Sequence, residues 1–271
     1  MLKRIITAAC LLPFILVILW IGEIPLLVSI VLFFSIIIYE MHFMFKNIGL
    51  EINRIIYSIW ILLTLLYAYF SQDVFWQYKI EAFIFLMVAG VLLLSVDSIY
   101  KTKSSNLKVM FLPIIFIVGL TFCFSHLVFF DQMIWEEGRK WIYLVLFTVI
   151  VNDTASMFMG KRFGKHKLFP KVSPNKTWEG LLGGILFAIV TCFLLNIIFS
   201  INLSIIKISF LSLIIVFFAH FGDFLESLLK RKTKVKDSGN ILPGHGGILD
   251  RIDSIVLNIP VAYYFFILWS I

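Results

Sequence analysis

The sequence predicts an all-α membrane protein, a bundle of about nine transmembrane helices. Two observations carry this prediction. Of the 271 residues, 61% are apolar and 14% are charged, whereas about a quarter of the residues in a soluble domain are charged. Apolar runs long enough to cross the hydrocarbon core, which takes about 20 helical residues, recur along the whole chain. We therefore expect a single membrane-embedded domain over 1–271 with no large soluble part.

Nine spans follow from the apolar runs and the short polar segments between them. Each span is expected to be helical, because backbone groups in lipid must be hydrogen-bonded within the segment and the runs lack the alternation of barrel strands. Only two apolar residues separate Arg4 from Thr7, too few for a cleaved signal before Cys10, so the first run is expected to stay as a span. The expected limits are 5–21, 25–45, 55–70, 80–96, 109–130, 141–160, 179–200, 203–229 and 252–270.

Basic residues divide unequally between the two sides of this predicted bundle. The N-terminus and the loops after spans two, four, six and eight hold 19 of the 23 Lys and Arg residues. The positive-inside tendency places that side in the cytoplasm. The two most basic loops, 161–178 and 230–251, both emerge there. Topology and attraction to anionic headgroups, worth about 1 kcal/mol per basic residue, explain much of the net charge of +7.

The segment 222–253 combines carboxylates, bases and glycines. Asp223 and Ser227 share a helix face, and so do Asp250 and Asp253. Mg²⁺ prefers carboxylate, water and phosphate oxygens and commonly takes only one or two protein carboxylates, while basic side chains and glycine N–H groups bind phosphate. The segment therefore predicts a magnesium site that receives a polyphosphate. The alternative is a plain glycine turn in which Asp250 and Asp253 cap the final helix. Against it stands Asp223, because an unpaired charge costs about 2.5–3.5 kcal/mol at the centre of a span.

A second polar segment begins inside the sixth span and continues to the start of the seventh. Asp153 is expected to be a buried acid that faces the bundle interior, which marks a functional site by default. Ser173, Lys176 and Thr177 offer hydroxyl and ammonium donors just before a helix, a composition typical of a phosphate-holding turn. The alternative is that Ser173 or Thr177 is the N-cap of the seventh span, and the two roles can coexist.

In order and spacing, the residues of 222–253 resemble the signature of the phosphatidate cytidylyltransferase family. The matching residues are Ser227, Lys230, Arg231, Lys236, Asp237, Pro243, His245, Gly246, Gly247, Asp250, Arg251 and Asp253. Gly222-Asp223 and the run from Ser173 to Gly180 are similar to that family as well, and the resemblance is sharpest over 152–260. Ser156-Met157 depart from the alanine-tyrosine pair of many relatives. The resemblance divides the domain into N-terminal spans, 1–151, and catalytic spans and loops, 152–271.

The resemblance implies a nucleotidyltransferase of phospholipid biosynthesis that transfers CMP from CTP to phosphatidic acid with Mg²⁺; whether a monovalent cation joins the Mg²⁺ is left open. It also implies a homodimer in the inner (cytoplasmic) membrane, with an active site that faces the cytoplasm and no nucleic-acid partner. The expected catalytic residues are Asp223, Asp250, Lys230, Arg231, Lys236 and Asp237. The expected substrate-binding residues are Ser173, Asn175, Lys176, Thr177, Ser227, His245, Gly246, Gly247, Arg251 and Asp153. The expected metal ligands are Asp223, Asp250 and Asp253.

Three other functions compete with this interpretation. A CTP-dependent lipid kinase would need a base for its substrate hydroxyl and would release CDP. A CDP-alcohol phosphotransferase is disfavoured because the Asp-Gly-x-x-Ala-Arg element of that family is absent from the sequence. A transporter could bury Asp153 and Asp223 as ion or proton sites. The sequence shows no clear inverted repeat, however, and two basic loops on one side favour a cytoplasmic substrate.

Overall fold

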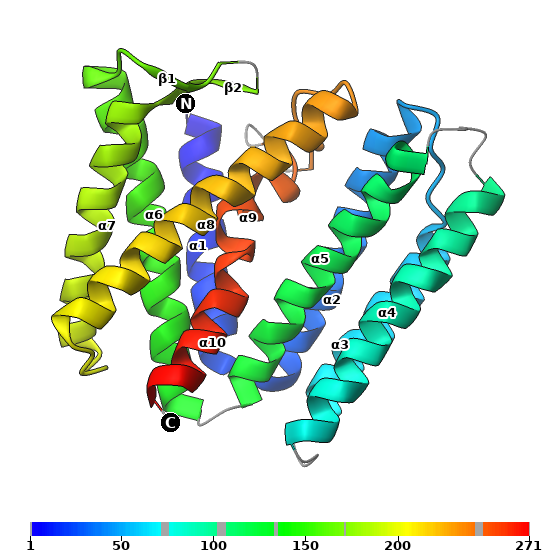
Figure 1. Ribbon diagram of the computed structural model, residues 1–271, viewed down its shortest axis with the longest axis horizontal. Helices are drawn as coiled ribbons and strands as arrows, with labels where there is room; N and C mark the ends of the chain where they lie inside the picture. The colour runs from blue at the N-terminus through cyan, green and yellow to red at the C-terminus, as the bar shows by residue number, and fades with distance from the viewer. Residues whose placement is uncertain are drawn as a thin grey trace. The chain divides into compact units, whose positions relative to one another are not determined.

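The computed structural model describes residues 2–71, 76–101, 107–132, 135–170, 172–241 and 246–270. They divide into two compact units. The first unit contains Met1–Met133 and Lys232–Arg251, and the second contains Ile134–Arg231 and Ile252–Ile271. Both units are helical (Figure 1), which confirms the predicted all-α class.

Five helices form the first unit: α1 (Leu2–Ile21), α2 (Glu23–Lys46), α3 (Arg54–Phe70), α4 (Trp76–Lys101) and α5 (Leu107–Gln132). Helices α2 to α5 lie side by side (Figure 1). Phe34 of α2 and Phe124 of α5 meet edge to face with ring centroids 5.2 Å apart, and both side chains are buried. Large apolar residues such as Ile55 and Phe85 are exposed on the outside of the helices, as a surface in contact with lipid requires.

The second unit is built around α6 (Trp135–Phe163) and α7 (Trp178–Ile198), with α8 (Ile205–Lys232), the end of α9 (Leu249–Val256) and α10 (Asn258–Ser270). Glycines allow α6 and α7 to pack closely. A Cβ atom added to Gly184 of α7 would collide with the side chains of Ser156 and Asn152 on α6. A Cβ atom at Gly180 would lie 2.7 Å from the carbonyl oxygen of Ser156.

A two-stranded antiparallel hairpin connects α6 and α7, and the sequence analysis did not predict it. Strand β1 (Lys167–Phe169) pairs with β2 (Ser173–Thr177), and β2 contacts the ends of both helices (Figure 1). The carboxylate of Glu179, in the first turn of α7, accepts hydrogen bonds from the backbone N–H groups of Lys165 and His166 at 3.1 and 3.2 Å. The start of the hairpin is thereby fixed to α7.

The helix pattern agrees with the predicted spans. Among the described residues, seven helical segments are long and apolar enough to cross a membrane, and two shorter apolar helices, Leu11–Ile21 and Arg54–Phe70, match the other two expected spans. The last span is interrupted, because α9 ends at Val256 and α10 begins at Asn258. Helix α6 extends to Phe163, three residues beyond its predicted end, so residues 161–163 are helical rather than part of the predicted loop.

Candidate active site

Three acidic side chains from three helices come together in the second unit. This acidic cluster consists of Asp153 on α6, Asp223 on α8 and Asp253 on α9, which lie close enough for their charges to interact. The hydroxyl of Ser254 donates a hydrogen bond to Asp153 Oδ2 at 2.8 Å and so joins α9 to α6. The hydroxyl of Ser227 lies 3.4 Å from Asp223 Oδ1. Three of the predicted site acids therefore share one location.

Gly222 explains why α8 and α9 approach so closely at this point. A Cβ atom at Gly222 would collide with the backbone carbonyl of Asp253. Because Asp223 is the next residue along α8, the close approach brings its carboxylate beside Asp253. The predicted Gly222-Asp223 pair thus has a packing role for the glycine and a charge role for the acid.

Lys176 supplies the positive charge at the cluster. Strand β2 places its ammonium group in an ion pair with Asp223, where the Lys176 side chain is 19% exposed and that of Asp223 is 33% exposed. Asp223 is therefore not an unpaired charge in an apolar helix, and the ion pair offsets part of its desolvation cost. Three carboxylates and one ammonium leave the cluster with an excess of negative charge when the acids are ionised, which favours a cation.

Asp250 organises the glycine turn in the first unit. Its Oδ2 atom accepts hydrogen bonds from the backbone N–H of Ser238 at 3.0 Å, from the Ser238 hydroxyl at 3.0 Å and from the backbone N–H of Gly247 at 2.9 Å. Gly246 has φ +82°, and a Cβ atom there would lie 2.6 Å from the same oxygen. Asp250 lies in the first turn of α9, and its predicted role as a metal ligand stays a prediction.

Several other predicted residues have structural partners. Lys230 forms an ion pair with Glu226 at 2.5 Å, with both side chains largely buried. The Nε of Arg231 donates to the carbonyl oxygen of Val172 at 3.4 Å. The hydroxyl of Thr177 accepts from the backbone N–H of Gly180 at 3.1 Å, so Thr177 is the N-cap of α7, as one of the alternatives predicted.

The remaining predicted residues are mostly exposed to solvent. Ser173 is half-buried in β2; the exposed ones are Asn175, Lys236, Asp237 and Arg251. His245 lies outside the described residues. Asp223 belongs to the second unit and Asp250 to the first, so a metal ion shared by these two acids stays a prediction. Within the described part of the chain, no group of three or more His, Cys, Asp or Glu side chains is arranged to hold a metal ion.

Three residues beside the predicted acids were not expected from the sequence. Ser238 and Ser254 donate hydrogen bonds to Asp250 and Asp153, and Glu40 is linked to Asp250 through Ser238. Glu40 had a readable signal, because it is an acid within the second predicted span, and such acids mark functional sites by default. The two serines gave none. A serine near the end of a helix is common, and its partner is known only once the fold is known.

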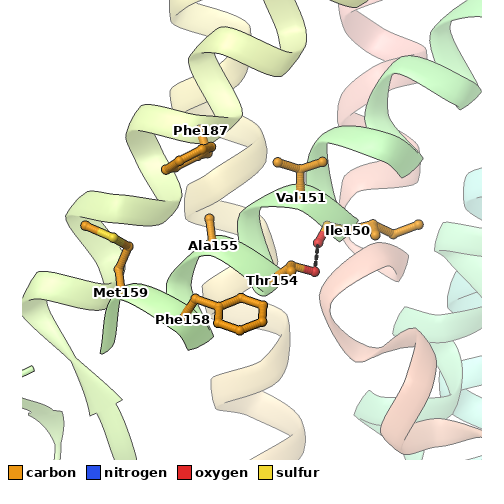
Figure 2. Close-up of a pocket in the computed structure, with 7 residues that line it drawn as sticks. All are labelled: Ile150, Val151, Thr154, Ala155, Phe158, Met159 and Phe187. Carbon is orange, nitrogen blue, oxygen red and sulfur yellow. Dashed lines mark hydrogen bonds between the residues drawn. The ribbon is translucent and has the colours of Figure 1, made fainter. Parts of the chain in front are cut away.

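An apolar groove of about 300 Å³ also opens on α6 and α7 (Figure 2). The only hydrogen bond drawn there runs from the Thr154 hydroxyl to the Ile150 carbonyl within α6, at 2.7 Å. The lining residues carry no charge: Ile150, Val151, Thr154, Ala155, Phe158, Met159 and Phe187. The groove therefore offers no charged group that could neutralise a phosphate.

The long apolar helices define a polytopic membrane protein, and its second unit holds a carboxylate cluster with a paired lysine. The chain belongs to the cytidylyltransferase family, whose model matches residues 2–269. This membership confirms the family resemblance and the predicted enzyme class, a nucleotidyltransferase.

Three relatives are named phosphatidate cytidylyltransferase. The protein of Bacillus subtilis is 35% identical over 205 residues, which cover 75% of this chain and 73% of the relative. The proteins of Staphylococcus epidermidis and Staphylococcus aureus are each 36% identical over 177 residues, covering 65% of this chain and 66% of the relative.

Proposed function

We propose that the chain transfers CMP from CTP to phosphatidic acid and so produces CDP-diacylglycerol and pyrophosphate. The observation that carries this proposal is the acidic cluster with Lys176 at its edge, in a chain that belongs throughout its length to a cytidylyltransferase family. A lipid phosphate and a nucleotide triphosphate are both anionic, so their reaction needs a site that supplies positive charge. The name shared by the relatives supports phosphatidic acid as the acceptor.

The reaction places few demands on acid–base chemistry. A phosphate oxygen of phosphatidic acid attacks the α-phosphorus of CTP, the bond from that phosphorus to the oxygen bridging to the β-phosphorus breaks, and pyrophosphate leaves with the electron pair. The attacking phosphate is already anionic at neutral pH, so no strong general base is required. Positioning and charge neutralisation therefore carry most of the catalysis, as in other phosphoryl transfers.

Two carboxylates of the acidic cluster offer oxygen ligands of the kind that Mg²⁺ takes; the described residues hold no group of three or more acids arranged around a metal ion. Asp223 and Asp253 would hold the ion, with Asp250 as the further expected ligand, because Mg²⁺ takes one or two carboxylates and keeps water and phosphate oxygens as its other ligands. When bound, Mg²⁺ neutralises charge on the CTP phosphates and polarises the α-phosphorus. The excess negative charge of Asp153, Asp223 and Asp253 over Lys176 supports this assignment.

Basic residues complete the proposed site. Lys176 neutralises Asp223 in the structure, and its ammonium would be available to a CTP phosphate when a cation binds that carboxylate. Lys230, Arg231 and Lys236 would stabilise the pyrophosphate leaving group. Lys230 must then exchange or share its present partner, Glu226.

The location and assembly of the enzyme are part of the same proposal. We place the site on the cytoplasmic side of the inner membrane, because CTP is cytoplasmic and 19 of the 23 basic residues fall on one predicted side. A homodimer is proposed on the family resemblance alone. Light scattering of the detergent-solubilised protein measures its mass and would contradict the dimer if it gave the mass of one chain.

The test is an assay of the purified full chain with phosphatidic acid and CTP labelled on either the α- or the γ-phosphate. We expect α-label in the lipid fraction, γ-label in pyrophosphate, and loss of both products with a chelator. Diacylglycerol, which lacks the phosphate nucleophile, is the control acceptor and should give no product. Transfer of γ-label to lipid with release of CDP would instead establish a lipid kinase, and solute flux without CTP turnover would establish a transporter.

A further inference from the structure

Glu40 is a buried acid to which neither the resemblance nor the proposed function gives a role. It lies in α2, within the membrane span Glu23–Lys46, and is 2% exposed. A carboxylate in such a place is destabilising unless hydrogen-bond donors surround it. Among the described residues, its hydrogen-bond donors come from the segment 232–251 of the first unit, which is about 200 residues away in the sequence.

The carboxylate of Glu40 holds the start of α9. Its Oε1 atom accepts the backbone N–H of Ile248 at 2.8 Å, and its Oε2 atom accepts the backbone N–H of Leu249 at 3.1 Å. Leu249 is the first residue of α9 and Ile248 immediately precedes it. N–H groups at a helix start have no backbone carbonyl within the helix to bond, and a negative charge there is favoured by the helix dipole. Glu40 therefore fixes the position and the direction of this turn.

The glycines of the loop make room for Glu40. A Cβ atom at Gly247 would lie 2.6 Å from both carboxylate oxygens of Glu40, and one at Gly239 would lie 2.9 Å from Oε1. The loop backbone thus surrounds this side chain on two sides. Gly247 was predicted to contact substrate, but a side chain at this position would also collide with Ser238 and Glu40.

Ser238 connects Glu40 to Asp250. Its hydroxyl oxygen is 3.1 Å from Glu40 Oε2 and 3.0 Å from Asp250 Oδ2. A hydroxyl has one proton to donate, so it serves one carboxylate at a time, while the Ser238 backbone N–H donates to Asp250 at 3.0 Å. The two acids are therefore linked through one residue, and the backbone N–H groups around them offset their mutual repulsion.

We propose that Glu40 is a positioning residue that holds Asp250 and the glycine turn in the geometry used for nucleotidyl transfer, an inference that rests on the proposed function. Glu40 acts through Asp250 and contacts no substrate atom in this scheme. Hydrogen bonds to one oxygen of Asp250 set the orientation of the carboxylate, and Glu40 fixes the residues that provide those bonds. Outer partners of this kind are typically worth 10- to 100-fold in metal affinity or activity.

Glu40→Gln is the sharpest perturbation. Glutamine has the same length, but one of its two terminal atoms is an NH₂ donor that would face the N–H or O–H donors of Ile248, Leu249 or Ser238. We expect kcat to fall 10- to 100-fold, or the Mg²⁺ concentration for half-maximal activity to rise by that factor, while KM for phosphatidic acid stays within threefold. Asp97→Asn is the matched control: Asp97 is also a buried acid of the first unit, 8% exposed, with its hydrogen bond to Asn53, and turnover should stay within threefold.

Amide hydrogen exchange of the substrate-free protein gives a readout that does not depend on activity. We expect Glu40→Gln to accelerate exchange at least tenfold at Ser238 and Gly247, whose N–H groups bond to Asp250 and not to Glu40, while α5 is unchanged. If Glu40 contributed only to overall stability, Glu40→Gln would accelerate amide exchange in α5 as well. Ser238→Ala is the second variant should Glu40→Gln fail to purify, and it should give the same local acceleration and a fall in kcat of threefold or more.

Exchange at Ser238 and Gly247 equal to that of the wild type in Glu40→Gln would overturn the proposal. A kcat and a half-maximal Mg²⁺ concentration that both stay within threefold of the wild type would also overturn it. In Ser238→Ala, amide exchange at Gly247 equal to that of the wild type would also overturn the proposal, and so would turnover within threefold of the wild type. If the wild type makes no CDP-lipid, the proposed function fails, whereas accelerated exchange at the two amides would still establish the link from Glu40 to Asp250.

Discussion

Asp223 has two proposed contributions, one to catalysis and one to stability through its ion pair with Lys176. Asp223→Asn removes both, and the two losses can be measured separately. The change keeps the side-chain shape but removes the negative charge. The ion pair is partly exposed, 19% for Lys176 and 33% for Asp223. Its loss should therefore cost about 1–2 kcal/mol, between the values for surface pairs and for broken buried pairs. We expect a fall of a few degrees in the thermal midpoint in detergent.

The effect on catalysis should be much larger. If Asp223 holds the metal ion as proposed, its loss should lower kcat at least 10³-fold, which corresponds to about 4 kcal/mol of transition-state stabilisation. The assay is CDP-lipid formation at several Mg²⁺ concentrations, together with thermal unfolding of the same preparation. High Mg²⁺ should restore part of the turnover of Asp223→Asn but none of its thermal stability.

A double variant distinguishes the two effects. In Asp223→Asn/Lys176→Met no unpaired ammonium remains, so most of the stability should return while turnover stays lost, because coupled residues are not additive. Asp131→Asn is the control for the same chemical change: Asp131 is buried at the end of α5, where it accepts the Glu23 N–H at 2.5 Å. Turnover of Asp223→Asn within threefold of the wild type at low Mg²⁺ would refute the role of this charge.

Three further predictions follow from the site, the packing and the topology. Lys230→Ala should lower turnover at least tenfold and also destabilise the protein, because the buried Glu226 loses this ion pair. Lys101→Ala, outside the signature, should keep turnover within threefold; equal effects of the two variants on turnover would indicate that Lys230 contributes only to membrane topology. Gly184→Ala should destabilise the protein by about 1–3 kcal/mol because its Cβ collides with α6, while Gly119→Ala, with nothing within 4 Å, should be neutral or stabilising; thermal unfolding compares the two. A single cysteine at Val235 in a cysteine-free background should react with a membrane-impermeant thiol reagent only from the cytoplasm, and labelling of intact cells from outside would reverse the assigned orientation.

Most of the helices could be predicted from the sequence because hydropathy determines them directly. A long apolar run in lipid has one way to satisfy its backbone, so the expected 179–200 and 203–229 correspond to α7 (Trp178–Ile198) and α8 (Ile205–Lys232). Finer features depend on contacts between distant residues. The hairpin of Lys167–Phe169 with Ser173–Thr177 has no apolar alternation, and its position depends on the bonds of Glu179 to Lys165 and His166.

The acids of the candidate site could be predicted because a charged side chain within a membrane span is costly and therefore marks a functional site by default. Asp153 and Asp223 were expected on this ground, and the structure places them in one cluster with Asp253. Their partners were not predictable. The pairing of Lys176 with Asp223 requires the hairpin, and the bond from Ser254 to Asp153 requires α9 to pack beside α6.

Some residues of the family motifs have structural contacts in addition to their proposed contact with substrate, and this affects how their substitutions should be interpreted. Thr177 caps a helix, Lys230 balances a buried glutamate, and one oxygen of Asp250 accepts three hydrogen bonds from its own loop. A loss of activity after substitution of any of these residues has two explanations: loss of a contact with substrate, or displacement of the local backbone. Lys236 is exposed in the structure, so its substitution tests contact with substrate more directly. A signature of this length therefore identifies the family with high specificity, but only variants paired with a stability measurement can assign each of its residues to catalysis.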